Sequence, residues 1–156
     1  MIVELNKNNL TMLDNSFIDK NYVQKELSVN PYGKFLLLIE DNEIIGYLYY
    51  SDIFDRAEIN QIEINSIHRN CGKGKILMDY LIDNVDKDIS LEVKVDNEPA
   101  LKLYKKYGFE QVAVRKGYYQ GVDGLLMERT IKHQDEWCFF IEVMYKMEYY
   151  KDRGGV

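Results

Sequence analysis

The sequence predicts a single α/β (α+β) domain with a mixed β-sheet. Its 156 residues suit one domain, and 46% of them are hydrophobic, which is enough for a substantial core. Helix-like and strand-like stretches alternate in the second half of the chain, and this order implies at least one parallel β-α-β unit. Two adjacent strand-like stretches in the first half predict an antiparallel hairpin.

The chain begins with a predicted strand and a predicted helix. Residues 1–5 (MIVEL) are a short, mostly apolar stretch that is typical of a strand. Residues 11–29 are polar with apolar residues at loose helical spacing, which predicts a helix. Residues 31–33 (Pro-Tyr-Gly) then form a turn, because proline and glycine favour such breaks.

Three strands are predicted next. Residues 34–40 (KFLLLIE) and 44–54 (IIGYLYYSDIF) flank the turn Asp-Asn-Glu and form a hairpin. The isoleucines among polar residues between positions 57 and 67 favour a further strand, because β-branched side chains suit strands. Apolar and polar residues alternate strictly only over residues 62–64.

Two helices follow, one over residues 74–85 and one starting at Asn97, with the strand 89–95 between them. The apolar residues of the first helix fall on one helical face. Asn97 is a good N-cap residue, and Pro99 lies in the first turn, where its missing N–H costs little. Gly108 is placed to end the second helix as a glycine at the C′ position.

The last predicted strands are residues 109–116 and 125–131, with residues 118–124 (YYQGVDG) as their connection. The remaining segment, 132–156, is rich in aromatic residues, and its periodicity fits an amphipathic helix or an added strand. We therefore expect a domain over residues 1–131 and a C-terminal extension over 132–156. The extension would pack on the same domain or form an interface in a homodimer, since a large apolar stripe is usually covered.

Charge and composition exclude several classes of function. The formal charge of −6 argues against a nucleic-acid binder and mildly favours a cationic substrate. Cys71 and Cys138, with His68 and His133, show no spacing typical of a disulfide framework or a metal site, so we expect no metal. The N-terminus lacks a signal-peptide pattern, and no apolar run is long enough to cross a membrane, so a cytoplasmic protein is expected.

The stretch HRNCGKGKILMDYLI, residues 68–82, resembles an anion site. The first N–H groups of a helix have no carbonyl partners, and Gly72 and Gly74 let a phosphate approach the backbone. Arg69, Lys73 and Lys75 would add positive charge at the rim. The spacing of a Walker loop is absent. The dinucleotide-binding fingerprint is only partly met, because Leu77 replaces its third glycine although Asp96 follows the next strand. By itself this stretch is also compatible with an ordinary turn before a helix.

A second motif, within residues 97–109, makes the prediction of an anion site more specific. It reads Asn-x-x-Ala-x-x-Leu-Tyr-x-x-x-Gly-Phe, and it follows Arg-x-x-Gly-x-Gly at residues 69–74. Together the two motifs resemble the GNAT superfamily of acetyl-CoA-dependent N-acetyltransferases, and the match covers roughly residues 44–129. The resemblance implies a mostly antiparallel sheet with a parallel β-α-β splay, flanked by helices. It also implies direct transfer of an acetyl group from acetyl-CoA to a primary amine in a ternary complex.

The resemblance narrows to one branch of the superfamily. Residues 91–97 (LEVKVDN) and 115–129 (RKGYYQGVDGLLMER) are similar to the bacterial ribosomal-protein alanine N-acetyltransferases. Two departures concern the acceptor: Val-Asp-Gly at 122–124 stands where those enzymes have Glu-Asp-Ala, and about two dozen residues follow their usual end. The resemblance makes a protein N-terminus the leading acceptor. A small-molecule amine, or a non-catalytic acyl-CoA-binding module, is the alternative.

The resemblance implies two catalytic residues. Glu92 lies where these enzymes keep their general base; the alternative is a solvated strand glutamate paired with Lys94. Glu63 on the neighbouring strand is the reserve candidate for the base. Tyr104 matches the tyrosine near the sulfur, which donates a proton to the departing thiolate; the alternative is a core aromatic residue.

The resemblance also implies the binding residues. Strand residues 62–64 would contact pantetheine through their backbone, Asn97 would bond to the pantetheine arm, and residues 70–75 would hold the pyrophosphate. Cys71 in this loop is expected to be a filler residue rather than a nucleophile. Tyr118 and Tyr119 would line the acceptor side. The full set expected to bind acetyl-CoA is Ile62, Glu63, Ile64, Arg69, Asn70, Cys71, Gly72, Lys73, Gly74, Lys75, Asn97 and Tyr104.

Overall fold

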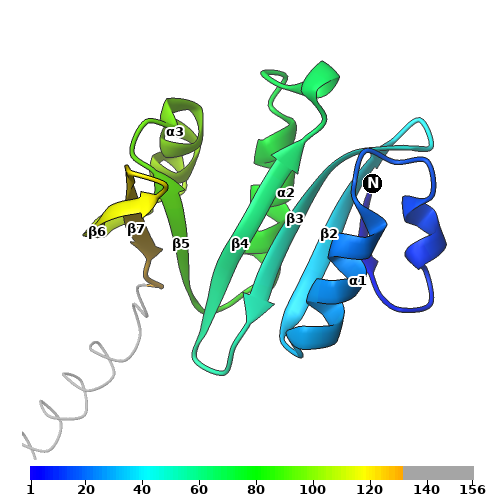
Figure 1. Cartoon of the computed structure of the whole chain (residues 1–156), viewed down its shortest axis with the longest axis horizontal. Helices are drawn as coiled ribbons and strands as arrows, with labels where there is room; N and C mark the ends of the chain where they lie inside the picture. Colours follow the sequence, from blue (N-terminus) through cyan, green and yellow to red (C-terminus); the bar gives the residue numbers. More distant parts are fainter. Residues whose placement is uncertain (132–156) are drawn as a thin grey trace, which may run out of the picture.

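One mixed sheet of seven strands organises the chain in a computed structural model, which describes residues 1–131 (Figure 1). The strand order across the sheet is β1-β2-β3-β4-β5-β7-β6. The strands are β1 (Ile2–Leu5), β2 (Gly33–Glu40), β3 (Glu43–Asp52), β4 (Arg56–Ile64), β5 (Asp88–Lys94), β6 (Glu110–Tyr119) and β7 (Val122–Arg129). The helices are α1 (Lys20–Val29), α2 (Lys73–Asn84) and α3 (Glu98–Lys106), with 3-10 turns η1 (Leu10–Leu13) and η2 (Ser66–His68).

The sheet is antiparallel except at one junction. Strands β1 to β4 form an antiparallel meander, and β5, β7 and β6 form a second antiparallel group. These two groups meet where β4 and β5 pair in parallel, and α2 supplies the crossover between them. The predicted α/β fold with a mostly antiparallel sheet and a parallel β-α-β unit is therefore confirmed.

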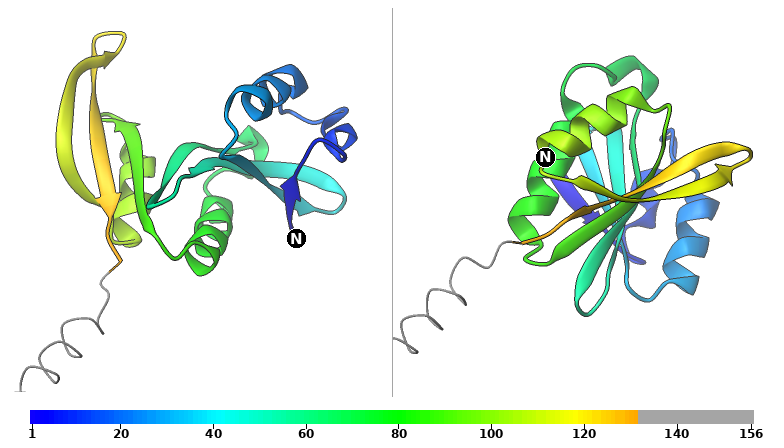
Figure 2. Two further views of the ribbon diagram at one scale, coloured as in Figure 1. Left: turned by 90° about the horizontal axis from the view of Figure 1, so that it is seen from below. Right: turned by 90° about the vertical axis from the view of Figure 1, so that its left-hand side faces the viewer.

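Two apolar cores cover the two faces of the sheet at β2 and β3, and α1 and α2 lie on opposite sides of the sheet (Figure 2). Along β2, Phe35 and Leu37 belong to the core under α1, whereas Leu36 and Leu38 belong to the core under α2. Successive side chains of a strand point to opposite faces, so a strand buried on both faces needs a continuous apolar run. The sequence KFLLLIE meets this need.

The predicted helix over residues 11–29 is wrong in its first part. The structure has the short turn η1, then a break, and then α1 from Lys20. Asn15 adopts a left-handed backbone conformation (φ 64°), which a continuous helix does not allow. Asp19 is the N-cap of α1, and its carboxylate accepts the backbone N–H groups of Asn21 and Tyr22.

The connection predicted over residues 118–124 is also wrong. Strands β6 and β7 continue to a two-residue turn, Gln120-Gly121, in which both residues have positive φ (51° and 97°). Such turns match the twist of the strands they join. The ends of α3 agree with the prediction: the Asn97 side chain accepts the Ala100 N–H, and Gly108 follows with φ 80°.

The predicted extension, residues 132–156, lies outside the described residues, so its structure and the domain boundary stay predictions. Within residues 1–131, none of the helices combines the length and the apolar character required to span a bilayer.

Gly46 on β3 generates the first testable prediction. A Cβ atom at this position would come within 2.5 Å of Ile64 Cδ1 and 3.0 Å of the Glu63 carbonyl oxygen. We expect Gly46→Ala to lower the free energy of unfolding by about 1–3 kcal/mol, because the end of β4 must shift. Urea unfolding measures this value, with Glu43→Ala at the exposed start of β3 as the control. Equal stability of Gly46→Ala and the control would contradict the close packing of β3 against β4.

Candidate functional site

A cleft opens where the parallel strands separate. Strands β4 and β5 pair only over Arg56–Ile59 and Asp88–Leu91. Beyond these residues β4 continues to Ile64 without a partner on that side, and Figure 1 shows the two strands diverging toward the tip of β4. A cavity of about 680 Å³ lies at this end of the sheet, between β4, the loop before α2 and the start of α3.

The cleft brings together all of the residues expected to bind the cofactor except Cys71 and Tyr104. It is lined by Ile62, Glu63, Ile64, His68, Arg69, Asn70, Gly72, Lys73, Gly74, Lys75, Asn97, Pro99, Ala100 and Leu103. The Cys71 thiol is exposed and lies 3.4 Å from the carbonyl oxygen of Arg69. Cys71 is thus the one residue of the 69–75 loop that does not line the cleft.

The loop before α2 presents a concave set of backbone N–H groups. Asn70 and Gly72 have left-handed backbone conformations (φ 62° and 74°), and Gly72 is the N-cap of α2 without a side-chain cap. Among the described residues, the N–H groups of residues 70–74 donate to no protein oxygen. Backbone nests of this kind at a helix N-terminus bind anions, since the helix dipole adds partial positive charge.

Two of the three basic side chains around this loop, those of Lys73 and Arg69, are already engaged by the protein, whereas the exposed side chain of Lys75 lines the cleft. Lys73 Nζ lies 2.6 and 2.7 Å from the two carboxylate oxygens of Glu40, at the end of β2. Arg69 donates from Nε to the Ile64 carbonyl (2.9 Å), and its Nη2 lies 3.8 Å from Glu63. The sequence placed these cations at the rim as ligands for an anion. The structure instead has Lys73 and Arg69 joining α2 and the loop to β2 and β4.

Asn97 and its neighbours form the opposite wall. The Asn97 side chain caps α3 and also lines the cleft, so the cap seen here is compatible with its second expected contact. Pro99, Ala100 and Leu103 line the cleft as well, and none of them was predicted as a binding residue. Apolar wall residues carry no chemical signal in a sequence, which explains why they were missed.

His68 was also missed as a cleft residue. It begins the stretch that resembles an anion site and was otherwise considered only as a metal ligand, yet it ends η2 and lines the cleft next to the N–H nest. Its Nε2 atom is buried and lacks a hydrogen-bond partner among the described residues. No sequence pattern could have shown this.

Glu92 on β5 lies in a cluster of charged and aromatic side chains, the other members of which belong to β6. Its carboxylate is largely buried and pairs with Arg115 at 2.8 Å, not with Lys94 as the alternative had it. Tyr118 and Tyr119 stack edge to face with ring centroids 4.9 Å apart, and Arg115 lies 5.2 Å from the centre of the Tyr118 ring. The Glu92 carboxylate raises the pKa of the Tyr118 phenol, while the Arg115 charge opposes this shift.

Gly124 on β7 makes room for the tyrosine pair. A Cβ at this position would come within 3.2 Å of the Tyr119 ring and 3.3 Å of the Tyr118 ring. These contacts are tighter than most side chains accept, so an alanine here would require both rings to shift. The departure from Ala to Gly noted in the sequence therefore sets the position of the two rings.

Tyr104 is buried in the core rather than in the wall of the cleft. It is 5% exposed and packs against Phe109, with ring centroids 5.8 Å apart. Burial, with a smaller contribution from Tyr119, raises the pKa of Tyr104 to about 12. The phenol is therefore protonated at neutral pH and can donate a proton. Burial in turn raises the pKa of Tyr119, as does the charge of Glu92, so Tyr119 lies within electrostatic reach of Glu92 on one side and of Tyr104 on the other.

Glu63 joins the cleft to a second cavity of about 360 Å³. Tyr47 Oη donates to Glu63 Oε2 (3.2 Å), and so does Gln61 Nε2 (3.3 Å). The Tyr22 hydroxyl in turn donates to Gln61 Oε1 (3.1 Å). This second cavity is lined by Phe17, Ile18, Asp19, Tyr22, Tyr47, Gln61 and Glu63. The sequence did not predict it, because its residues come from the segment before α1, from α1 itself and from two strands.

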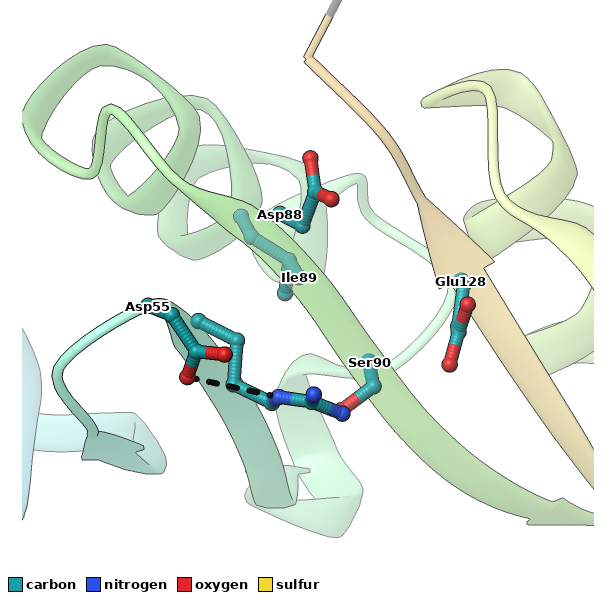
Figure 3. Close-up of a pocket in the computed structure, with 6 residues that line it drawn as sticks. Asp55, Asp88, Ile89, Ser90 and Glu128 are labelled. Carbon is teal, nitrogen blue, oxygen red and sulfur yellow. Dashed lines mark ion pairs between the residues drawn. The ribbon is translucent and has the colours of Figure 1, made fainter.

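A third, smaller hollow of about 170 Å³ lies at the opposite ends of β4 and β5 (Figure 3). Asp55, Asp88, Ser90 and Glu128 lie around it, and Asp55 forms an ion pair with Arg56 at 3.6 Å. None of the site residues expected from the sequence lies there.

Comparison with known proteins agrees with this geometry. The profile of the Acetyltransferase (GNAT) family matches residues 6–109. A Bacillus subtilis protein, provisionally named ribosomal protein bS18 alanine N-acetyltransferase, is 36% identical over 118 residues, which are 72% of this chain and 78% of that one.

Two solved structures share the fold. The ribosomal-protein-S18-alanine N-acetyltransferase of Escherichia coli has a TM-score of 0.73 at 20% identity, covering 87% of this chain and 96% of that chain. A GNAT family acetyltransferase from Elizabethkingia anophelis with acetyl-CoA bound has a TM-score of 0.67 at 21% identity, covering 84% and 97%.

The raised pKa of Tyr104 predicts a stability change at alkaline pH. Below pH 10 both the folded and the unfolded chain keep this phenol protonated, so its contribution to stability is fully present. Between pH 10 and about 12 the unfolded chain releases the proton first, and this stability is lost. Over this pH range, we expect the free energy of unfolding to fall by roughly 2–3 kcal/mol less in Tyr104→Phe than in the wild type.

Urea unfolding at a series of pH values measures the difference in slope. Tyr32→Phe, at a half-exposed ring, is the matched control and should follow the wild type. Parallel curves for Tyr104→Phe and the wild type would mean that the phenol is solvated in the folded protein.

Proposed function

The chain belongs to the acetyltransferase (GNAT) family and is an acetyl-CoA-dependent N-acetyltransferase, and from this premise we propose that its acceptor is the N-terminal amine of a protein. The similarity to a relative named for alanine N-acetylation of ribosomal protein bS18 supports this acceptor. The motif around Tyr118 and Tyr119 also supports it. We further propose a cytoplasmic enzyme whose catalytic domain is residues 1–131.

The cleft fits acetyl-CoA by the chemistry of its walls. The unengaged N–H groups of residues 70–74 form an anion nest that suits the pyrophosphate. The end of β4, residues 60–64, has no strand partner on the side of β5, so its backbone groups are available to the amide groups of pantetheine. When bound, acetyl-CoA supplies an acetyl group activated as a thioester.

Glu92 is the proposed general base. An alkylammonium or peptide α-ammonium is mostly protonated at neutral pH, with pKa values near ~10 and ~8, so the acceptor must lose a proton before its nitrogen attacks. The Glu92 carboxylate takes that proton, and Arg115 at 2.8 Å holds the carboxylate in place. The nitrogen then forms the new amide bond as the carbon–sulfur bond breaks, and it releases its second proton to solvent, which balances the proton that the departing sulfur takes up.

Tyr104 is the proposed proton donor. Its buried phenol stays protonated at neutral pH, so it can give its proton to the departing sulfur. Tyr119 lies within electrostatic reach of both Glu92 and Tyr104, which supports a single reaction centre between them.

The acceptor would reach this centre from the side of the tyrosine pair and the second cavity. The second cavity carries the carboxylates of Asp19 and Glu63 beside the rings of Phe17, Tyr22 and Tyr47. Carboxylates and aromatic faces both attract ammonium groups. Glu63 is the reserve candidate for the base, because it belongs to both cavities.

The single observation that carries the proposal is the cleft where β4 and β5 separate, which is lined by the loop with the unengaged N–H groups of residues 70–74. Removing the proposed groups should therefore stop turnover without preventing cofactor binding. We expect Glu92→Gln to lower kcat by ~10²–10⁴-fold and Tyr104→Phe by ~10-fold or more. Thiol release from acetyl-CoA measures kcat, and calorimetry measures binding of coenzyme A.

Glu110→Gln, at the exposed start of β6, is the matched carboxylate-to-amide control and should keep wild-type rates. If Glu92→Gln kept its rate while Glu63→Gln lost it, Glu63 would be the base. Binding of coenzyme A without thiol release by any variant or the wild type, with every acceptor tried, would favour a non-catalytic acyl-CoA-binding module.

The acceptor class is tested directly with a panel of amines. Short peptides beginning with Ala, Ser or Met are compared with spermidine and free lysine, and the products are identified by mass spectrometry. We expect peptides with an N-terminal alanine to have the highest kcat/KM, by ~10-fold or more over the small amines, since they bind more of the acceptor side. A higher kcat/KM for spermidine would replace the protein acceptor by a small-molecule one.

A further inference from the structure

The side chain of Lys94, at the end of β5, shares a face of the sheet with the proposed base. Residues two apart on a strand point to the same face, so Lys94 lies beside Glu92, whereas Val93 between them is buried in the apolar core. Across the sheet, Lys94 pairs with Gly124 on β7, and Gly124 pairs with Arg115 on β6. Two cations and one carboxylate therefore lie close together on one face of three neighbouring strands.

The tyrosine pair lies on this face, between the two cations. Gly124 leaves room for both rings, because an added Cβ would meet Tyr119 at 3.2 Å and Tyr118 at 3.3 Å. The Lys94 ammonium lies 5.5 Å from the centre of the Tyr119 ring. The Arg115 guanidinium lies 5.2 Å from the centre of the Tyr118 ring. Both distances are typical of cation–π contacts, so each ring has one cation of the protein over its face.

Positive charge exceeds negative charge at the tyrosine pair. Glu92 and Arg115 form an ion pair at 2.8 Å, which adds no net charge. The neighbouring ion pair of Lys116 with Asp123, also at 2.8 Å, adds none either. The Lys94 ammonium contacts a neutral phenol ring, which attracts a cation without cancelling its charge. The three charged side chains at the pair thus sum to one positive charge, in a chain whose formal charge is −6.

A molecule in solution can reach these groups. Lys94 is exposed, and the Tyr118 ring and the Arg115 side chain are half-exposed. The Glu92 side chain keeps 16% of its exposure. Lys94 does not line the cofactor cleft, so a molecule that contacts it enters from the acceptor side.

We propose that Lys94 is a specificity-determining residue that selects the N-terminal amine of a peptide over the amines of a polyamine. Its ammonium donates a hydrogen bond to the first carbonyl oxygen of a peptide acceptor, and it repels a second ammonium group at the same place. The inference rests on the proposed acceptor site beside Glu92.

The spacing of the two side chains fits this selection. Side chains two residues apart on a strand are separated by ~7 Å, which is the spacing of Glu92 and Lys94. The amine and the carbonyl oxygen of one residue are about 3 Å apart and fit between these groups, with a hydrogen bond of about 2.9 Å at either end. In spermidine the next ammonium follows the reacting amine at about 5–6 Å. That second charge would meet the Lys94 ammonium instead of a hydrogen-bond donor's partner.

A charge series at position 94 tests this role, because selection by charge must follow the charge. Lys94→Arg keeps the positive charge, Lys94→Met keeps the apolar stem without it, and Lys94→Glu reverses it. Each variant receives acetyl-CoA and an equimolar mixture of spermidine and an amidated peptide that begins with alanine and has no charged side chain. Mass spectrometry of the products gives the ratio of kcat/KM for the peptide to kcat/KM for spermidine. We expect this ratio to stay within about 3-fold of the wild type in Lys94→Arg, to fall about 10-fold in Lys94→Met and to fall about 100-fold in Lys94→Glu.

Separate rate measurements distinguish a substrate contact from packing. Lys94→Met should raise KM for the peptide about 3-fold at unchanged kcat, since the contact is the same before and during the reaction, and should lower KM for spermidine by a similar factor. A packing role against the Tyr119 ring would leave Lys94→Met like the wild type, because methionine keeps the stem, and this result would overturn the proposal. Coenzyme A should bind equally to all variants by calorimetry, since Lys94 lies outside the cofactor cleft. Lys102→Met, at an exposed position of α3, is the matched control for the loss of a charge and should keep the wild-type ratio.

A salt titration of the wild type needs no variant and keeps the test informative if one folds poorly. Salt screens charges at an exposed site, so at about 1 M salt the wild-type ratio should approach that of Lys94→Met at low salt. A ratio independent of both salt and the charge at position 94, in a wild type that acetylates the peptide, would overturn the role of Lys94 and leave the N-terminal acceptor in place. A wild type that preferred spermidine would overturn both proposals. A wild type that released no thiol with any acceptor would disprove the proposed function itself.

Discussion

The early end of the pairing between β4 and β5 is the constraint on which the rest of the molecule depends. These strands share a ladder over Arg56–Ile59 and Asp88–Leu91 and then separate. Backbone groups in a protein interior need partners, so a strand edge that has lost its neighbour is stable only if water or a ligand replaces it. The same separation brings the tip of α2 and the start of α3 to the two sides of one opening.

Polar interactions around this opening divide into two kinds. Ion pairs such as Lys73–Glu40 and Arg115–Glu92 join one element to another and fix their positions. The groups left over, above all the N–H groups of residues 70–74, are the ones that can receive a ligand. In a chain with a net charge of −6, backbone dipoles would thus hold the proposed anion without a large basic surface.

The sequence alone predicted the elements that depend on local chemistry. The cap at Asn97, the terminating Gly108 and the apolar run of β2 each carry a signal within a few residues, and each was confirmed. The break at Asn15 was missed, because a left-handed asparagine leaves no periodic trace. The connection predicted over residues 118–124 was longer than the two-residue turn Gln120-Gly121. The reason is that strand residues next to a tight turn resemble loop residues in composition.

The candidate site divides in the same way. The motif residues that line the cleft could be named from the sequence, because they lie together in the chain. Contacts between distant segments could not be: Lys73 with Glu40, Glu92 with Arg115, and the second cavity beside Glu63. The orphaned nitrogen of His68 is invisible to any pattern, since it is defined by what surrounds it in three dimensions.

Glu63 belongs to both the cofactor cleft and the second cavity, and this sharing has a thermodynamic consequence. Its carboxylate faces Arg69 on one side and the hydroxyl of Tyr47 on the other. A cation that enters the second cavity competes with Arg69 for the same negative charge. Occupancy of one cavity then changes the affinity of the other, and linkage requires the effect to be reciprocal. The two cavities would then be coupled through one shared carboxylate rather than through a moving domain.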